Sequence, residues 1–252
     1  MADSAVAPGL VDASRSEAPP RHSVLVRVTH WISTLCFFAL LLSGVEVLIS
    51  HPRFYWGEDG NALSPPLFII PIPASRATVP TGYKYVLPDQ NGWSRSLHFQ
   101  SAWLVVFTGL LYGVSGLISR HFRNDLLPQR EGLQGAALSK AIGDHLRFRK
   151  PPASEERSYN TLQRIAYSSV VFLLFPLMVW TGLAMSPAIA SVFPIAVTAL
   201  GGQQSARTIH FFDTILLVLF VLVHIAMVLR AGFKSRMRAM IAGRPTAAKE
   251  QV

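Results

Sequence analysis

The sequence predicts an all-α integral membrane protein, a four-helix bundle with a long periplasmic loop between helices 1 and 2. Half of its 252 residues are hydrophobic and only 15% are charged, a composition that soluble domains rarely show. The hydrophobic residues gather in four stretches of about 20 residues, long enough to cross about 30 Å of hydrocarbon as helices. The basic residues concentrate in alternate segments between these stretches, as they do in multi-pass membrane proteins.

Each hydrophobic stretch predicts one membrane span. The spans run from about Val24 to Ile49, Leu97 to Ser119, Leu162 to Met185 and Thr208 to Leu229. Pro176 lies inside the third span, where a membrane helix tolerates a kink. Residues 187–202 are apolar but too short for a span and are broken by Pro194, so we expect a partly interfacial connector there.

The segments outside the spans set the predicted boundaries of the folded domain. Residues 1–20 are small, polar and proline-containing without the apolar core of a cleavable signal, and they predict a disordered tail. The folded domain is predicted over 21–244, followed by a tail at 245–252. Residues 51–92 are rich in proline and aromatic residues, which indicates a long ordered loop between the first two spans. The single cysteine, Cys36, allows no disulfide framework and no C-x-x-C motif.

The charge distribution predicts the orientation. The formal charge is +9, and the basic residues concentrate in 15–27, 120–157 and 230–249. The alternate segments carry only Arg53, Arg76, Lys84, Arg95 and Arg207. Because Lys and Arg are retained in the cytoplasm, both termini should be cytoplasmic and the aromatic loop periplasmic. This leaves no soluble basic domain that would bind nucleic acid.

Four of the eight histidines fall inside predicted spans, where ionisable residues are costly and usually functional. His210 and His224 are 14 residues apart in the fourth span, so they share one helix face about 21 Å apart in depth. The direction of each span puts His98 at the depth of His210, and His30 at the depth of His224. Any one of them could be an ordinary interfacial histidine. Two imidazoles from different helices at each of two depths, however, suit the axial ligands of haem iron.

An arginine precedes three of these histidines by three residues: Arg27, Arg95 and Arg207. Residues three apart share a helix face, so each guanidinium can pair with an anionic haem propionate near the membrane surface. The alternative is an arginine that extends from the end of a span into the interface. Several glycines in the spans leave room for a flat macrocycle, although close helix packing is the simpler explanation. These glycines are Gly44, Gly109, Gly113, Gly116 and Gly182.

The spans and their histidines resemble the bacterial cytochrome b561 and nickel-hydrogenase cytochrome b family, which includes the cytochrome b subunits of formate dehydrogenase, hydrogenase and thiosulfate reductase. The resemblance covers about residues 21–244. It is carried by Arg27-Val-Thr-His30-Trp31, Leu97-His98-Phe99, Ala206-Arg207-Thr-Ile-His210 and Val223-His224-Ile225. It implies two haem b groups in the bacterial inner membrane, one held by His30 and His224 and the other by His98 and His210.

The start of the third span is similar to the segment that lines a quinone site in the formate dehydrogenase subunits. This segment is Tyr159-Asn160-Thr-Leu-Gln163-Arg164. The resemblance implies that Asn160 and Gln163 contact quinone. A polar helix start with Asn160 near the N-cap explains the same residues equally well.

The resemblance implies an electron-transfer subunit, with no catalytic side chain of its own, that links a periplasmic redox partner to the quinone pool. Residues 51–92 and 125–157 depart from the formate dehydrogenase and hydrogenase subunits. The sequence looks closer to thiosulfate-reductase-like cytochromes that serve periplasmic molybdenum oxidoreductases. Two alternatives stay open: a self-sufficient membrane oxidoreductase of the same architecture, acting on superoxide or a small acceptor, and a non-haem transporter of protons or metal ions.

Overall fold

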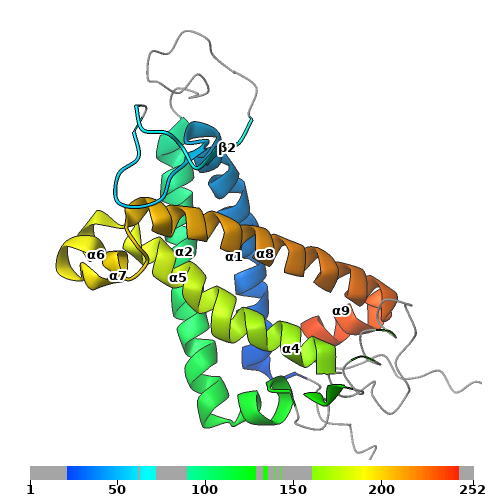
Figure 1. The fold of residues 1–252 in the computed structure, drawn as a ribbon. Helices are drawn as coiled ribbons and strands as arrows, with labels where there is room; N and C mark the ends of the chain where they lie inside the picture. The colour runs from blue at the N-terminus through cyan, green and yellow to red at the C-terminus, as the bar shows by residue number, and fades with distance from the viewer. Residues whose placement is uncertain are drawn as a thin grey trace, which may run out of the picture.

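The computed structural model describes residues 22–61, 63–71, 90–128, 133–135, 139, 143 and 161–243. Four segments within it are long and apolar enough to cross a membrane (Figure 1). They are α1 (Val24–Ser50), α2 (Gln90–Ile118), the run of α4 (Thr161–Ser169), η4 (Val170–Leu174) and α5 (Phe175–Ala184), and α8 (Gln203–Arg230). The predicted all-α membrane class with four spans is therefore confirmed. The two predicted tails, residues 1–20 and 245–252, lie outside the described residues.

Two of the spanning helices begin earlier than hydrophobicity predicts. α2 begins at Gln90 instead of about Leu97, and α8 begins at Gln203 instead of about Thr208. Their first turns are polar, so they continue the helix without adding to the apolar stretch that marks the span. His98 and His210 consequently lie well inside helices, not at their starts.

The interruption expected at Pro176 takes the form of a π-helical turn. Proline has no N–H to donate, and a helix must absorb the missing bond. The N–H of Phe175 donates to the carbonyl of Val170, five residues earlier, so η4 widens the helix before α5 restarts with Pro176 in its first turn.

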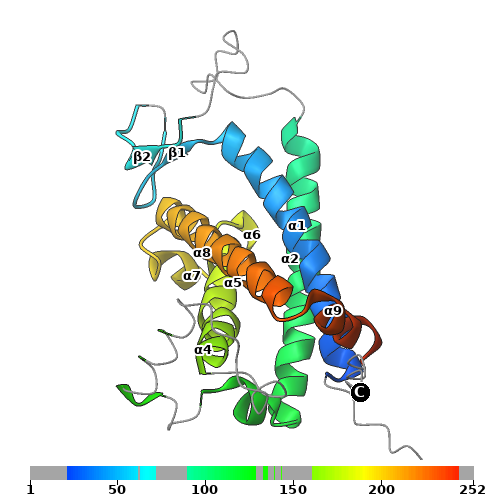
Figure 2. The same cartoon turned by 90° about the vertical axis from the view of Figure 1, so that its right-hand side faces the viewer.

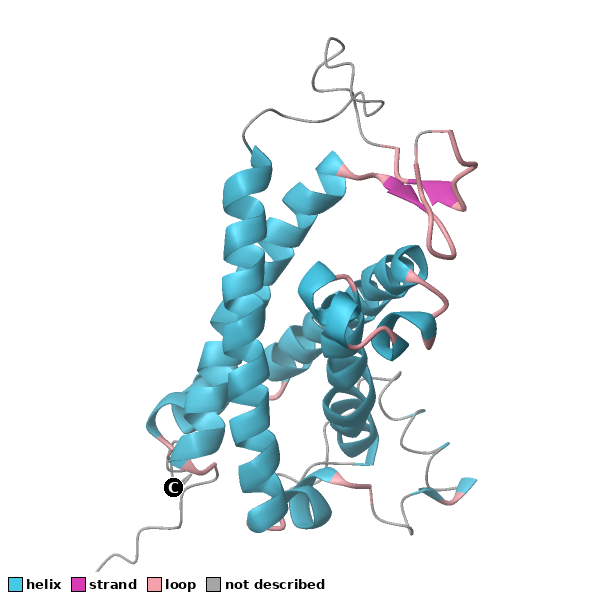
Figure 3. Ribbon diagram, turned by 90° about the vertical axis from the view of Figure 1, so that its left-hand side faces the viewer, coloured by secondary structure: helices cyan, strands magenta, loops and turns pink. Residues whose placement is uncertain are grey.

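Shorter elements lie between and after the spans. The connector predicted over residues 187–202 forms α6 (Pro187–Val192) and α7 (Ile195–Thr198). η1 (Phe122–Leu126) follows α2, and α9 (Phe233–Ala242) follows α8. In the described part of the first long loop, β1 (Arg53–Phe54) pairs antiparallel with β2 (Phe68–Ile69). This hairpin stands at one end of the helices (Figure 3).

The spanning helices form two pairs. α1 lies beside α2, α5 lies beside α8, and the second pair crosses the first at a steep angle (Figure 1 and Figure 2). The closest backbone packing occurs within each pair. Large apolar side chains such as Leu35 and Leu117, each 71% exposed, cover the outside, as expected for helices solvated by lipid.

Candidate functional site

The four histidines of the spans meet as two pairs across the helix pairs. The ring centres of His30 on α1 and His224 on α8 are 6.4 Å apart, with the ring planes inclined at 47°. The ring centres of His98 on α2 and His210 on α8 are also 6.4 Å apart, inclined at 56°. These are the two pairs that the depth of each histidine predicts. We call His98 and His210 the hairpin-side pair, and His30 and His224 the terminus-side pair.

The spacing of the rings suits a metal ion held between them. Metal–imidazole bonds are about 2 Å long, so two imidazoles on opposite sides of one ion have ring centres about 6 Å apart. Among the described residues, no three His, Cys, Asp or Glu side chains come together in a metal-binding group. Two imidazoles alone are the axial set of a haem iron, whose other four ligands come from the macrocycle, whereas a bare zinc ion takes three or four protein ligands.

Hydroxyl groups fix the tautomer of the hairpin-side pair. The Thr181 hydroxyl on α5 lies 2.8 Å from His210 Nδ1, and the Ser43 hydroxyl on α1 lies 3.1 Å from His98 Nδ1. Each hydroxyl donates its own proton to a carbonyl one turn earlier in its helix, at 2.8 Å for Thr181 and 2.7 Å for Ser43. Each oxygen therefore accepts the Nδ1–H of the histidine, and Nε2 keeps the free lone pair that binds a metal.

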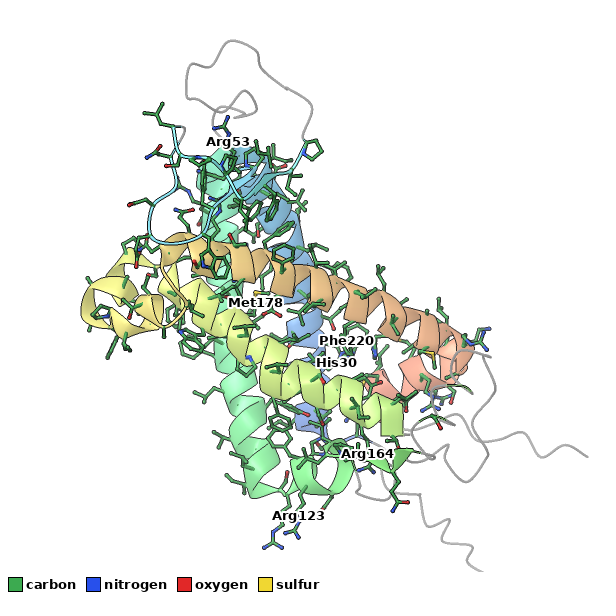
Figure 4. The ribbon with its side chains drawn as sticks, viewed as in Figure 1. His30, Arg53, Arg123, Arg164, Met178 and Phe220 are labelled. Atoms are coloured by element: carbon green, nitrogen blue, oxygen red, sulfur yellow. The ribbon has the colours of Figure 1, made fainter. Side chains whose placement is uncertain are left out.

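The terminus-side pair has a different environment. The Thr34 hydroxyl lies 3.3 Å from His30 Nδ1 and donates to the His30 carbonyl at 2.8 Å. The His224 ring stacks on Phe220 at 5.8 Å and meets the edge of Tyr167 at 6.1 Å. Among the described residues, no side chain forms a hydrogen bond with His224. His30 thus has a long hydrogen bond and the edge of Trp31 beside it at 5.5 Å, whereas His224 has only aromatic neighbours among the described residues. Figure 4 labels His30 and Phe220.

Two of the span glycines face the hairpin-side histidines. A Cβ atom at Gly44 would lie 3.6 Å from His98 Cε1, and one at Gly182 would lie 3.6 Å from His210 Cε1. Any longer side chain would occupy the space beside these rings, so both glycines fit a flat group held there. Gly109 and Gly116 instead pack against the rings of Phe175 and Phe122. These two glycines therefore serve close packing, the alternative explanation for the span glycines.

The arginines before the histidines contact backbone carbonyls. Arg207 donates to the carbonyls of His51 and, at 2.8 Å, of Arg53, and its guanidinium lies 4.9 Å from the centre of the Phe54 ring. Arg27 donates to the Ile241 carbonyl on α9 at 2.8 Å. Both side chains therefore tie distant segments to a span. Arg95 is exposed on α2. Pairing of the three arginines with haem propionates stays a prediction.

The first loop closes over the start of α8. The Gly57 carbonyl accepts the Gln204 N–H at 3.0 Å, the Ser205 hydroxyl accepts the Gly57 N–H at 2.8 Å, and the Thr208 hydroxyl donates to the Tyr55 carbonyl at 2.7 Å. The first bond uses a backbone N–H that a helix start leaves free, and the other two use side-chain hydroxyls of the first turns of α8. Sequence reasoning missed this cap, because the partners are separated by about 150 residues of chain.

The structure describes only one of the two residues predicted to contact quinone. Asn160 lies outside the described residues. Gln163 is half-buried on α4, and Tyr167 follows it one turn later on the same face, against the ring of His224. Arg164, only 9% exposed, donates to the carbonyls of Asn124 and Leu127 and fastens η1 to α4. Sequence reasoning missed Tyr167, although its spacing from Gln163 was a usable signal.

One buried carboxyl group lies near the hairpin-side pair. Asp213 is 2% exposed, and neither of its oxygens has a hydrogen-bond partner in the part of the chain that the structure describes. It lies one turn after His210 on α8. An unpaired carboxyl group inside a membrane helix is costly, which marks this position as one to test. The sequence signal was present, since Asp213 is the one acidic residue of the fourth span.

Comparison with known proteins identifies the family of this chain. The sequence model of the prokaryotic cytochrome b561 family matches residues 21–243. The putative protein-methionine-sulfoxide reductase subunit YedZ1 of Azospira oryzae is 28% identical over 212 residues, which cover 82% of this chain and 89% of that protein. No solved structure matches the chain. Because the family match includes all four spans and all four histidines, the chain belongs to the prokaryotic cytochrome b561 family of multi-pass membrane haem proteins.

Proposed function

We propose that this chain is a di-haem cytochrome b subunit that carries electrons between a periplasmic redox partner and the quinone pool. The observation that carries the proposal is the pair of histidine sites on α8, each with ring centres 6.4 Å apart. Bound haem b supplies reversible one-electron chemistry at two depths of the membrane. In this proposal His98 and His210 hold one iron, and His30 and His224 hold the other.

The surrounding residues prepare the hairpin-side site for binding. The Thr181 and Ser43 hydroxyls hold two of the imidazoles in the tautomer that presents Nε2. Gly44 and Gly182 leave the space beside the rings open. The two levels are about 21 Å apart along α8, and the edges of two macrocycles would be closer than that, which favours electron transfer between them.

The partner is proposed from the distribution of charge and from the relative. The hairpin end has few basic residues, so we place it in the periplasm of a bacterial inner membrane, with both termini in the cytoplasm. YedZ1 is named as a subunit of a reductase. We propose that this chain likewise serves a periplasmic oxidoreductase, and the resemblance to thiosulfate-reductase-like cytochromes suggests a molybdenum enzyme.

The quinone site is proposed at the terminus-side pair. Gln163 lies one turn before Tyr167 on the same face of α4. The Tyr167 ring contacts the ring of His224. A quinone that accepts a hydrogen bond from the Gln163 side chain would lie close to this pair. Asn160, which lies outside the described residues, is the second proposed contact.

A haem-content assay tests the ligand assignment. The protein is expressed with ample haem, and its pyridine haemochromogen is quantified for single alanine variants of His30, His98, His210 and His224. Each variant should lose about one haem of two, since an iron with one histidine is poorly held. The matched control is His121→Ala, because His121 lies after α2 and contacts Tyr112 and Phe122 instead of another histidine.

Two results would contradict the proposal. The first is a colourless wild-type protein, which would favour a non-haem transporter. The second is full haem content after His210 and His224 are replaced together. Reduction or oxidation of quinone with a small acceptor by the purified chain alone, without any partner, would instead support a self-sufficient oxidoreductase.

A further inference from the structure

We infer that Ser43 and Thr181 are positioning residues that hold the midpoint potential of the hairpin-side haem below that of the terminus-side haem. The inference rests on the proposed ligation by the four histidines. It concerns the order of the two potentials, which the presence of four histidine ligands does not by itself decide.

The first step is the direction of the hydrogen bonds. Both hydroxyls are already donors to carbonyls of their own helices, so they can only accept from Nδ1–H of His98 and His210. A ring that donates from Nδ1 carries more negative charge on Nε2 and is a stronger ligand. A stronger ligand stabilises ferric iron more than ferrous iron and lowers the midpoint potential.

The second step is the difference between the two levels. Both rings of the hairpin-side pair donate to a hydroxyl, and both hydroxyls are fully buried, with Ser43 and Thr181 0% exposed. In the terminus-side pair His30 has a longer contact of 3.3 Å, and His224 is stacked on Phe220. Two hydrogen bonds of 2.8 and 3.1 Å at the hairpin-side pair place more negative charge on the ligating nitrogens than one contact of 3.3 Å at the terminus-side pair. The hairpin-side iron is therefore the harder one to reduce.

The consequence concerns where an electron resides. With unequal potentials, a single electron shared by the two sites is held mainly at the terminus-side pair, next to the proposed quinone contacts. The buried Asp213 carboxyl group would act in the same direction when ionised, and the variants chosen below leave it unchanged.

The test is redox potentiometry of the purified, haem-loaded full-length chain, combined with low-temperature EPR of the ferric state. Variants Thr181→Val and Ser43→Ala remove the hydroxyl and nearly preserve the shape, while Thr181→Ser keeps the hydroxyl. Thr29→Val is the matched control, since within the described part of the chain the buried Thr29 hydroxyl bonds only carbonyls of its own helix. The histidine variants show which of the two midpoint potentials belongs to which pair.

We expect two different potentials in the wild type, the lower one belonging to the hairpin-side pair. Thr181→Val and Ser43→Ala should each shift the lower potential upward and change one low-spin EPR signal, with the higher potential unchanged. Thr181→Ser and Thr29→Val should match the wild type. All four variants should retain the wild-type haem content.

Several results would overturn the inference while leaving the haem ligation intact. They are a hairpin-side potential equal to or above the other in the wild type, an unchanged potential in Thr181→Val and Ser43→Ala at full haem content, or an equal shift in Thr181→Val and Thr181→Ser. The wild-type order alone decides the case if a variant does not fold. Failure of the proposed function is distinct, since it appears as haem retained when the histidines are removed.

Discussion

At the scale of single residues, the site depends on small groups placed against the histidines. Ser43, Thr181 and Gly182 touch or face a histidine ring from a neighbouring helix. None of them belongs to a recognised motif, and serine, threonine and glycine are common in membrane helices for other reasons. Their role follows only from which ring they meet.

The glycines give a prediction at this scale. Gly44→Leu and Gly182→Leu should each lower haem content by about one haem of two, because the added side chain fills the space beside His98 or His210. Gly113→Leu is the control, since a Cβ atom there meets nothing within 4 Å. Haemochromogen assays check the three variants. Unchanged haem content in both Gly44→Leu and Gly182→Leu would show that no flat group occupies this space.

At the scale of elements, polar side chains join segments that are far apart in the sequence. Arg164 and Ser168 on α4 bond three carbonyls of the region around η1, and Arg207 on α8 bonds the loop that carries β1. The π-helical turn η4 absorbs the proline of the third span. These contacts and the π-helical turn join or shape elements, and none of them involves the four histidines directly.

Replacement of Arg164 tests the fastening of η1. Arg164→Gln should destabilise the protein by about 1–3 kcal/mol, because the carbonyls of Asn124 and Leu127 lose a buried donor. Thermal unfolding in detergent and the rate of proteolysis after α2 measure the effect. Arg123→Gln, at an exposed neighbouring position, is the control and should change neither. Equal stability of the two variants would show that Arg164 does not hold η1.

At the scale of the whole molecule, two helix pairs cross and present four imidazoles to one another. α8 supplies one ring to each pair, so this helix is common to both sites. The hairpin marks one end of the molecule, with Arg53, and Arg123 marks the other (Figure 4). The basic residues are concentrated at the second end, which is the basis for the proposed orientation.

Cysteine labelling tests this orientation. Asp59→Cys at the hairpin end should react with a membrane-impermeant maleimide in cells with a permeable outer membrane, and Lys234→Cys should react only after lysis. The wild type is the control, because its one cysteine, Cys36, is buried inside α1. Labelling of Lys234→Cys in intact cells with Asp59→Cys protected would reverse the proposed topology.

The four spans, the connector after the third and the pairing of the four histidines could be predicted from the sequence alone. These features depend on hydrophobicity and on helical rise, which act between neighbours along the chain, so spacing encodes them. Only the tertiary structure decided that the Thr181 hydroxyl meets His210, that Arg207 binds the first loop and that Gly57 caps α8. Those contacts join residues far apart in the chain, and their geometry arises from how whole helices pack, which no local pattern records.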